Sequence, residues 1–468
     1  MTETIVPTEQ ARRRTGRWID DWRPEDPGFW AGTGRKVAAR NLIVSVLTEH
    51  VGFSVWSLFS VMVLFMGPAY QLSTADKFLI TSTATAVGAV LRIPYNLAVA
   101  RFGGRNWTII SALLLLIPAA LCAVVMHPGT PVGTFVVVAA VTGVGGGNFA
   151  SSMTNINTFY PQSRKGWALG LNAGGGNLGV AVIMLVALLV LGTAGALQPR
   201  VVLWVYLPLI VIGAVCSALF MDNLTTVRND TKGMRLALRD AHCWVMSLLY
   251  IGTFGSFIGY SFAFGLVLQN QFHRTPVQAA AITFLGPLLG SLSRPVGGWL
   301  SDRIGGARVT FVNFGLMAVC AAVLVVAGGA VSLGLYEAAF VALFVFSGVG
   351  NGSTFKMIPA IYQAAAVARV GAGADPAAES LRARRLSGAV IGITAAVGAF
   401  GGVLINVAFR QSFAAAGSGT PAVLGFLVFY LVCAGLLWAV YLRRPAAPAT
   451  VPGAGVTHGP LSCAESRP

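Results

Sequence analysis

Three basic residues lie inside long apolar stretches of this chain, and two of them suggest a site for an anion. They are Arg92, Arg294 and Lys356. A charge at the centre of a membrane helix costs about 3 kcal/mol on insertion scales unless it meets a polar cavity or a partner. No acidic residue in the neighbouring stretches is an evident partner for either arginine. Paired guanidinium groups stay charged, and their planar forks suit a planar oxyanion, so the residues predict a small inorganic oxyanion of undetermined identity.

Each arginine also has an alternative role, in which its side chain extends along the helix to the membrane surface. Arg92 is about eight residues from the cytoplasmic end of its stretch, or roughly 12 Å at about 1.5 Å per residue, so this reach would be strained. Arg294 is slightly nearer to its end, and for Arg294 the alternative remains open. Lys356 either recruits anions from the cytoplasm or extends to the surface, and the sequence does not decide between these roles.

A second candidate chemistry is nucleotide binding, because Gly174, Gly176 and Gly179 have the spacing of a dinucleotide-binding fingerprint. That fingerprint requires a strand, a tight turn and the start of a helix. Here the glycines continue one uncharged apolar run with no turn residues. Close packing of small residues on a membrane helix explains them better. The same reading covers the other glycine-rich positions, which are Gly145, Gly146, Gly147, Gly175, Gly350 and Gly352.

Composition places the chain in a membrane. Of 468 residues, 55% are hydrophobic and only 10% are charged, far fewer charges than a water-facing surface needs. The mean hydropathy is +0.73. The net charge of +16 does not indicate nucleic acid, because it follows membrane topology. The predicted apolar spans are 41–66, 78–100, 107–127, 132–158, 166–191, 201–221, 244–271, 276–300, 308–330, 335–363, 385–412 and 421–443.

Twelve spans place both termini on one side, and the basic residues identify that side. Segments on the side of the termini hold most of the lysine and arginine, whereas the opposite loops hold only Lys77, Arg200, Arg274 and Arg410. The positive-inside rule therefore predicts that both termini and the loop 222–243 are cytoplasmic. Met1 to Arg40 is too polar for a cleaved signal peptide. The six cysteines lack metal-ligand spacing, so neither a metal site nor a disulfide framework is expected.

The two halves of the sequence repeat each other at an offset of 202 residues. The segment LRIPYNLAVARFGGR aligns with SRPVGGWLSDRIGGAR, which sets Arg92 opposite Arg294 and Gly103 opposite Gly305. The segment GGGNFAS aligns with GVGNGST at nearly the same offset. The repeat predicts an all-α membrane protein of two six-helix halves, with a substrate site between them. The predicted domain organisation is a cytoplasmic N-terminal segment 1–40, an N-terminal six-helix half 41–221, a central cytoplasmic loop 222–243, a C-terminal six-helix half 244–443 and a disordered cytoplasmic tail 444–468.

The segment GGWLSDRIGGAR resembles the cytoplasmic loop between the second and third helices of each half in the major facilitator superfamily. Asp302 and Arg303 in this loop are expected to make gating ion pairs with neighbouring helix ends, unless they are ordinary loop charges. The stretches GGGNFASSMTNINTFYP, KGWALGLNAGGGNLGV and GNGSTFKMIP resemble the two signature motifs of the NarK-type nitrate/nitrite porter family. The resemblance runs from about Arg40 to Arg444, and two separate signatures make it specific.

The resemblance implies transport of nitrate and nitrite by alternating access in a bacterial cytoplasmic membrane, with no cofactor and no covalent chemistry. It matches the paired arginines of the family to Arg92 and Arg294, and its substrate-binding tyrosine to Tyr250 rather than Tyr260. The aromatic side chains that enclose the anion match Phe53, Phe149, Phe254 and Phe355, and the substrate-side asparagine matches Asn177. Each phenylalanine has the alternative of an ordinary core or lipid-facing role. The chain is expected to act as a monomer in the bilayer.

The family contains both exchangers and proton-coupled importers. A proton-coupled carrier needs a titratable group within the membrane. Glu49 and His50, a turn or two inside the first span, and Tyr250 are the candidates, whereas Asp222 and Glu337 lie at span ends. Without a carboxylate beside the arginines, nitrate/nitrite exchange is the simpler expectation. Proton symport through Glu49, a carrier for another small anion, and a drug or sugar carrier are alternatives; a nicotinamide-dependent membrane enzyme lacks the soluble domain that it would need.

Overall fold

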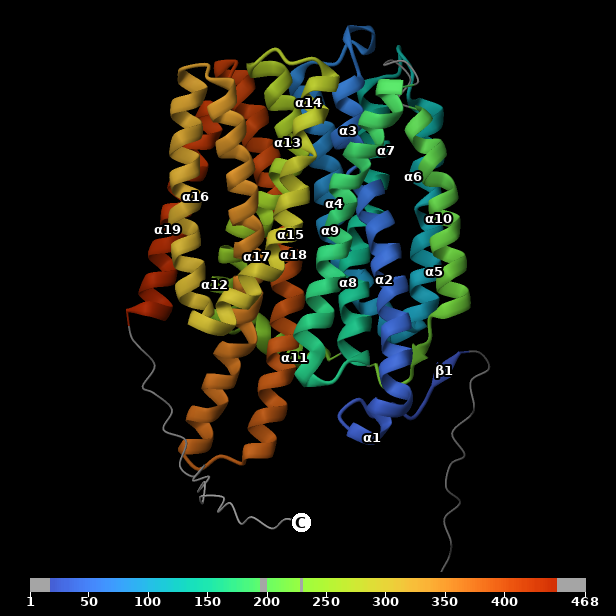
Figure 1. Ribbon diagram of the computed structural model, residues 1–468, viewed down its shortest axis with the longest axis vertical. Helices are drawn as coiled ribbons and strands as arrows, with labels where there is room; N and C mark the ends of the chain where they lie inside the picture. Colours follow the sequence, from blue (N-terminus) through green and yellow to red (C-terminus); the bar gives the residue numbers. More distant parts are fainter. Residues whose placement is uncertain (1–16, 194–199, 228–229, 444–468) are drawn as a thin grey trace, which may run out of the picture.

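A bundle of membrane-length helices forms this protein in the computed structural model, which describes residues 17–193, 200–227 and 230–443 (Figure 1). Twelve helical segments of these residues are long and apolar enough to cross a membrane. The predicted tail 444–468, with Cys463, and residues 1–16 of the predicted N-terminal segment lie outside the described residues.

The N-terminal half contains the first six segments, several of which are interrupted by a short irregularity. The segments in order are α1 (Pro27–Phe29), η1 (Trp30–Gly34), α2 (Arg35–Trp56) and α3 (Leu58–Phe65); α4 (Thr74–Phe102); α5 (Gly104–Leu114) and α6 (Leu116–Val125); α7 (Val132–Thr142) and α8 (Val144–Phe159); α9 (Gln162–Thr193); and α10 (Arg200–Phe220). A short η2 (Pro68–Tyr70) connects the first two segments.

The C-terminal half repeats this arrangement. Its segments are α12 (Ala241–Tyr250), η3 (Ile251–Gly255) and α13 (Ser256–Gln271); α14 (Pro276–Thr283) and α15 (Leu285–Ile304); α16 (Gly306–Gly329); α17 (Leu333–Gly371); α18 (Pro376–Ala416); and α19 (Thr420–Leu437) with η4 (Trp438–Leu442). The helix α11 (Thr231–Leu238) precedes this half. α17 and α18 are longer than predicted and extend as a hairpin beyond the lower end of the bundle (Figure 1).

The first helical segment begins earlier than the sequence predicted. Asp26 accepts hydrogen bonds from the backbone N–H of Gly28 and Phe29, and Pro27 occupies the first helical position, so the helix starts there. Residues 27–40, which the prediction assigned to the N-terminal segment, are therefore helical. Glu49 consequently lies deep within the segment rather than a turn or two from its start.

The predicted repeat is visible in local backbone geometry. α4 begins with a capping box on Ser73, and α14 begins with one on Thr275, which is 202 residues later. The same segments end at Gly103 and Gly305, with φ of 87° and 91°. A positive φ at this position favours glycine, because a β-carbon would be strained there. The segments that carry Arg92 and Arg294 therefore have the same local geometry at both ends.

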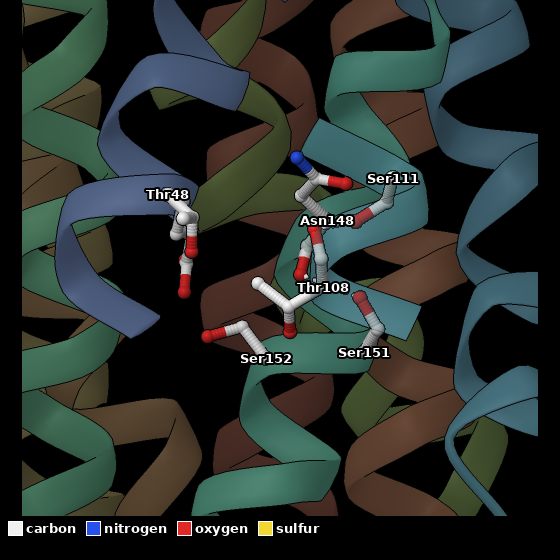
Figure 2. A pocket seen from close by; sticks show the side chains of 7 residues that line it. Thr48, Thr108, Ser111, Asn148, Ser151 and Ser152 are labelled. Atoms are coloured by element: carbon white, nitrogen blue, oxygen red, sulfur yellow. Dashed lines mark hydrogen bonds between the residues drawn. The ribbon is translucent and has the colours of Figure 1, made fainter. Parts of the chain in front are cut away.

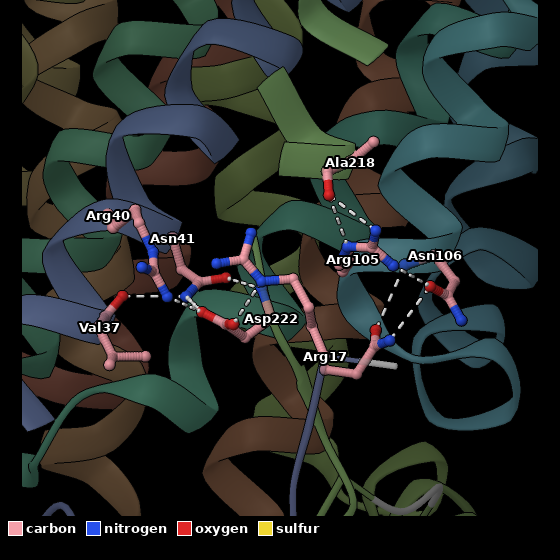
Figure 3. Close-up of polar contacts among 9 residues, drawn as sticks. Arg17, Val37, Arg40, Asn41, Arg105, Asn106, Ala218 and Asp222 are labelled. Atoms are coloured by element: carbon pink, nitrogen blue, oxygen red, sulfur yellow. Dashed lines mark hydrogen bonds and ion pairs between the residues drawn. The ribbon is translucent and has the colours of Figure 1, made fainter. Parts of the chain in front are cut away.

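Residues before the first segment pair with residues after the sixth at the lower end of the bundle. β1 (Trp18–Ile19) and β2 (Asn223–Leu224) form a two-stranded parallel sheet. Asp222 accepts hydrogen bonds from Arg40 at 2.6 Å and Asn41 at 3.0 Å, and Arg17 lies 3.4 Å away (Figure 3). Asp222 is thus a structural residue at a span end. β1, α1, α11 and the end of α19 all lie at this lower end (Figure 1).

Candidate functional site

Arg92 lies in the interior of α4, with 1% of its surface exposed. Its Nη1 donates a hydrogen bond to the carbonyl of Ala395 on α18, at 2.9 Å. The guanidinium carbon lies 4.6 Å from the ring centre of Phe149 and 4.9 Å from that of Phe254. The other two nitrogen atoms, Nε and Nη2, have no hydrogen-bond partner among the described residues. Arg92 therefore stays inside the bundle, as the cost argument predicted, and two of its three guanidinium nitrogens are unpaired among the described residues.

Arg294 is also buried, with 4% of its surface exposed, so it does not extend to the membrane surface. Its Nη2 donates to the hydroxyl of Tyr250 at 3.3 Å. Its guanidinium carbon lies 5.2 Å from the ring centre of Phe355. Nη1 has no hydrogen-bond partner in the described part of the chain. Each half thus supplies one buried arginine with unpaired donors.

A continuous set of aromatic rings connects the two arginines. Tyr250 stacks on Phe254 with ring centres 5.1 Å apart, and lies 4.8 Å from Phe355. Phe149 lies 6.0 Å from Phe254 across the boundary between the halves, and 6.0 Å from Phe53. All five predicted aromatic side chains therefore belong to one cluster. The π faces stabilise the guanidinium charges without using their N–H groups, so three of the six guanidinium nitrogens stay unpaired among the described residues.

Trp56 is a member of this cluster that the sequence reasoning missed. Its ring centre lies 5.7 Å from the guanidinium carbon of Arg92 and 5.3 Å from the ring of Phe53. Its Nε1 donates to the carbonyl of Ala84. The signal was its spacing of three residues from Phe53, which places both rings on one helix face. Tyr260, the rejected tyrosine, instead shares a hydrogen bond with Tyr430.

Asn177 lies on α9 with 1% of its surface exposed, and both of its amide atoms lack partners among the described residues. Asn351 on α17 has the same property. A buried amide without partners is costly, so each of these groups is available to a ligand or a water molecule. The direct contact of Asn177 with substrate stays a prediction.

Most of the signature glycines are required by close packing. A β-carbon at Gly145 would overlap the backbone of Gly52, and one at Gly176 would overlap the carboxyl group of Glu49. Similar overlaps arise at Gly146, Gly147, Gly175, Gly350 and Gly352. Gly174 differs, because its β-carbon would make only an ordinary contact of 4.0 Å with the carbonyl of Ser291. The packing prediction is therefore wrong for Gly174, which faces α15 loosely.

The predicted gating residues have different partners. Asp302 accepts hydrogen bonds from Nζ of Lys356 at 2.8 Å on both oxygens. Lys356 lies in the interior of α17, not at a helix end, and belongs to the same half as Asp302. Arg303 stacks over Trp299 of its own helix at 4.0 Å and forms no ion pair among the described residues. Asp302 thus forms an ion pair, but with a residue inside α17 and not at a helix end, and Arg303 forms none among the described residues. The gating function of Asp302 and Arg303 stays a prediction.

Glu49 is buried but forms no ion pair with Arg92 or Arg294 among the described residues, as the sequence led us to expect. It is 1% exposed on α2, and its Oε2 accepts a hydrogen bond from Nδ2 of Asn172 at 2.7 Å. A role of Glu49 in proton coupling stays a prediction. The adjacent His50 faces the carbonyl of Gly175, at 3.2 Å.

Two six-helix halves with a buried, positively charged site at their boundary define a secondary transporter. The family model of the Major Facilitator Superfamily matches residues 50–405 of this sequence. The chain is 39% identical to the nitrate/nitrite transporter NarU of Salmonella typhimurium over 448 residues, which cover 91% of this chain and 96% of the relative. It is 32% identical to the probable nitrate/nitrite antiporter NarK2 of Thermus thermophilus, covering 92% and 98% of the two chains.

A solved structure has the same fold. A bacterial homologue of the human lysosomal transporter Spinster, in an inward-facing and unoccupied conformation, matches with a TM-score of 0.59 and 14% identity over 86% of this chain and 96% of that chain. The chain belongs to the nitrate/nitrite transporter family of the Major Facilitator Superfamily.

Proposed function

We propose that this protein moves nitrate and nitrite across the membrane by alternating access, exchanging one anion for the other. The observation that carries this proposal is the set of three unpaired guanidinium nitrogens, Nε and Nη2 of Arg92 and Nη1 of Arg294, in a fully buried aromatic site. Unpaired buried donors are costly, and an anion accepting hydrogen bonds from them would remove that cost.

Nitrate and nitrite suit this site in shape and charge. Both are planar, carry a single negative charge, and present oxygen atoms that accept hydrogen bonds in the plane. The flat faces of Phe149, Phe254 and Phe355 offer walls for a planar anion, while the arginine edges offer donors. Asn177 would supply a further donor. The relatives NarU and NarK2 are named for the same substrates.

Exchange follows from the charge of the site. Without substrate the two arginines repel each other, and moving two buried positive charges between conformations is unfavourable. A bound anion supplies compensating charge and allows the halves to rotate. The Nη1 bond from Arg92 to Ala395 joins the halves at this point and would break as they move.

The proposal also covers the location, orientation and oligomeric state of the protein. It would lie in a bacterial cytoplasmic membrane with both termini inside, act as a monomer, and use neither cofactor nor catalytic chemistry. Asp302 and Lys356 would brace the C-terminal half during the rotation. Proton-coupled nitrate symport is the second candidate, and the burial of the Glu49 carboxyl group in α2 is the observation that favours it.

Uptake of labelled nitrate into proteoliposomes tests the proposal. Uptake is expected to require nitrite or nitrate inside the vesicle, and to be lost in Arg92→Ala. The exposed Arg303→Ala variant is the matched control, because it removes an arginine outside the site. If correctly reconstituted protein takes up no labelled nitrate with either nitrite or nitrate inside the vesicle, the assignment of substrates is wrong.

A further inference from the structure

The side-chain amide of Asn351, in the C-terminal half, is buried without a partner. Asn351 lies on α17 with 1% of its surface exposed, and neither Nδ2 nor Oδ1 has a hydrogen-bond partner among the described residues. A buried polar group in this state costs free energy, which a ligand that forms hydrogen bonds with it would recover. The family resemblance matches Asn177 to the substrate-side asparagine and gives Asn351 no role.

The two glycines that flank Asn351 show where its side chain points. A β-carbon on Gly350 would lie 2.5 Å from Cγ2 of Thr253, so this side of α17 meets η3. A β-carbon on Gly352 would overlap the backbone oxygen of Arg294, so that side of α17 meets α15. Successive residues of an α-helix are about 100° apart, and Asn351 comes between the two glycines. Its side chain is therefore directed into the wedge between η3 and α15.

The wedge between η3 and α15 also holds the polar groups of the predicted anion site. Nη2 of Arg294 donates to the hydroxyl of Tyr250, which immediately precedes η3, at 3.3 Å. Phe355 comes one helical turn after Asn351, and its ring centre lies 5.2 Å from the guanidinium carbon of Arg294. Side chains on an α-helix lean toward its N-terminus, so the Phe355 ring lies at the level of Asn351. The Asn351 amide and Nη1 of Arg294 therefore lie at one level of the wedge, and both lack partners in the described chain.

The asparagine at the repeat-related position of the N-terminal half has different surroundings. Asn148, which the sequence repeat aligns with Asn351, lies with hydroxyl groups of α5 and α8 around a small polar cavity (Figure 2). The cavity volume is about 10 Å³, which is room for about one water molecule. Its lining contains no arginine among the described residues. The C-terminal half, in contrast, places the equivalent amide beside a guanidinium group.

A further amide donor at this point distinguishes nitrate from nitrite. Both anions can accept hydrogen bonds from the two arginines through two oxygen atoms. Nitrate has a third oxygen atom in the same plane, whereas nitrite has only a lone pair on nitrogen there. A site that donates a hydrogen bond to one group of a substrate discriminates against an analogue without that group, because the buried donor is then left unpaired. An additional donor therefore strengthens nitrate binding more than nitrite binding.

We propose that Asn351 donates a hydrogen bond from Nδ2 to an oxygen atom of nitrate bound beside Arg294, and that this contact makes the site prefer nitrate to nitrite. This proposal rests on the proposed transport of nitrate and nitrite. Asn351 and Phe355 belong to the same helix, so the selective donor and one aromatic wall of the site move together when the halves rotate.

Anion binding to the purified full-length protein tests the proposal. Labelled nitrate gives the dissociation constant for nitrate, and competition by unlabelled nitrite gives the constant for nitrite. Asn351→Leu removes the amide and keeps a side chain of similar size. It should weaken nitrate binding about ten-fold and nitrite binding less than about three-fold. The ratio of the two constants is the decisive readout, because general damage to the site would weaken both anions alike.

Asn313→Leu is the matched control. Asn313 on α16 is 2% exposed, and its Oδ1 also lacks a partner in the described chain. Its Nδ2 lies 2.7 Å from a β-carbon placed on Gly350, so this amide adjoins the same stretch of α17 from the side of α16 rather than α15. The substitution removes a comparable buried amide outside the wedge. It should leave the ratio of the nitrate and nitrite constants unchanged.

The outcomes separate this proposal from the proposed function. Unchanged nitrate binding in Asn351→Leu, equal losses for both anions, or the same change of ratio in Asn313→Leu would overturn the selective contact alone. Absence of nitrate binding in the unmodified protein would overturn both proposals. If Asn351→Leu does not fold, a crystal structure of the unmodified protein with nitrate decides. Nδ2 of Asn351 should lie within about 3.2 Å of a nitrate oxygen, and a separation beyond hydrogen-bond range would overturn the contact.

Discussion

Nη1 of Arg92 donates a hydrogen bond to the carbonyl oxygen of Ala395, 2.9 Å away on the opposite half of the molecule. The arginine of the N-terminal half is thus held by the backbone of the C-terminal half. Its cation also stacks against Phe254, again from the opposite half. Substrate binding and the contact between halves therefore depend on the same guanidinium group.

The first prediction concerns the shape of the arginine side chains. Arg92→Lys and Arg294→Lys keep the charge but lose the planar fork. We expect each variant to lose most nitrate binding, ten-fold or more, because a charge-assisted hydrogen bond contributes about 1.5–3 kcal/mol. Binding of labelled nitrate to purified protein measures this. The double variant should show no exchange while remaining inserted.

Arg303→Lys is the matched control, because Arg303 lies on the same helix as Arg294 but outside the site. It should bind nitrate normally. Near-normal binding by Arg92→Lys or Arg294→Lys would mean that the site needs only positive potential, and would contradict the role assigned to the unpaired N–H groups.

The second prediction compares two glycines of one signature motif. Gly176→Ala should impair transport, because its β-carbon would overlap the Glu49 carboxyl group. Gly174→Ala should transport normally, because its β-carbon would make only an ordinary contact. Exchange rates in proteoliposomes, normalised to reconstituted protein, distinguish the two. Equal activity of both variants would show that the α2–α9 contact tolerates extra volume.

The third prediction is topological. Cysteine introduced at Lys232 should be labelled only from the cytoplasm, and cysteine at Gly129 only from outside. The reason is that Lys232 lies at the basic end of the bundle and Gly129 in a turn between α6 and α7 at the other end. A membrane-impermeant thiol reagent on whole cells makes the measurement. External labelling at Lys232 would reverse the orientation.

The fourth prediction concerns the ion pair of Asp302 and Lys356. The side chains are 60% and 38% exposed, so the pair should contribute at most about 1 kcal/mol to stability. Lys356→Ala and Asp302→Asn should each change nitrate affinity less than two-fold and slow exchange. The double variant should be no slower than either single variant. Additive losses in a double-mutant cycle would show that the two residues act independently.

The fifth prediction is a pH dependence outside the membrane segments. Arg385 donates two hydrogen bonds to Asp230, at 2.7 and 2.6 Å, and these bonds hold the pKa of Asp230 below its ordinary value. A lowered native pKa stabilises the fold above that value, and the contribution disappears as the pH falls through it. Asp230→Asn should therefore melt earlier than the unmodified protein at about pH 7, and the difference should shrink as the pH falls below the ordinary pKa of an aspartate.

Thermal unfolding followed by intrinsic fluorescence across this pH range makes the comparison. Asp375→Asn is a suitable control, because Asp375 caps α18 without contacting Arg385 among the described bonds. A difference between Asp230→Asn and the unmodified protein that grows in acid would contradict the sign of the expected effect.

Several features of the site could be predicted from the sequence, because burying a charge in a membrane helix costs free energy. Two arginines at repeat-related positions inside apolar runs had to find an anion or a partner, and both are buried as expected. The placement of Phe149, Phe254 and Phe355 required the family resemblance, because a phenylalanine in an apolar helix carries no positional signal of its own. The repeat itself was readable, down to the glycines that end α4 and α15.

Other features depend on which helices meet, and the sequence alone does not state this. Lys356 and Asp302 are 54 residues apart on different helices, and only their packing makes them partners. Glu49 was placed too near the start of its helical segment, because residues 27–40 were interpreted as a polar, non-helical segment. Charges such as Arg35, Lys36 and Arg40 obscured a helix that Asp26 and Pro27 begin.

The sheet between β1 and β2 has a consequence for how the protein is made. It joins residues that precede the first segment to residues that follow the sixth, and Asp222 fixes the junction through Arg17, Arg40 and Asn41. All of these residues have been synthesised by the time Leu224 leaves the ribosome. The first six helices can therefore close into a finished unit during translation, before the second half of the chain exists, and that unit can serve as the surface on which the second half assembles.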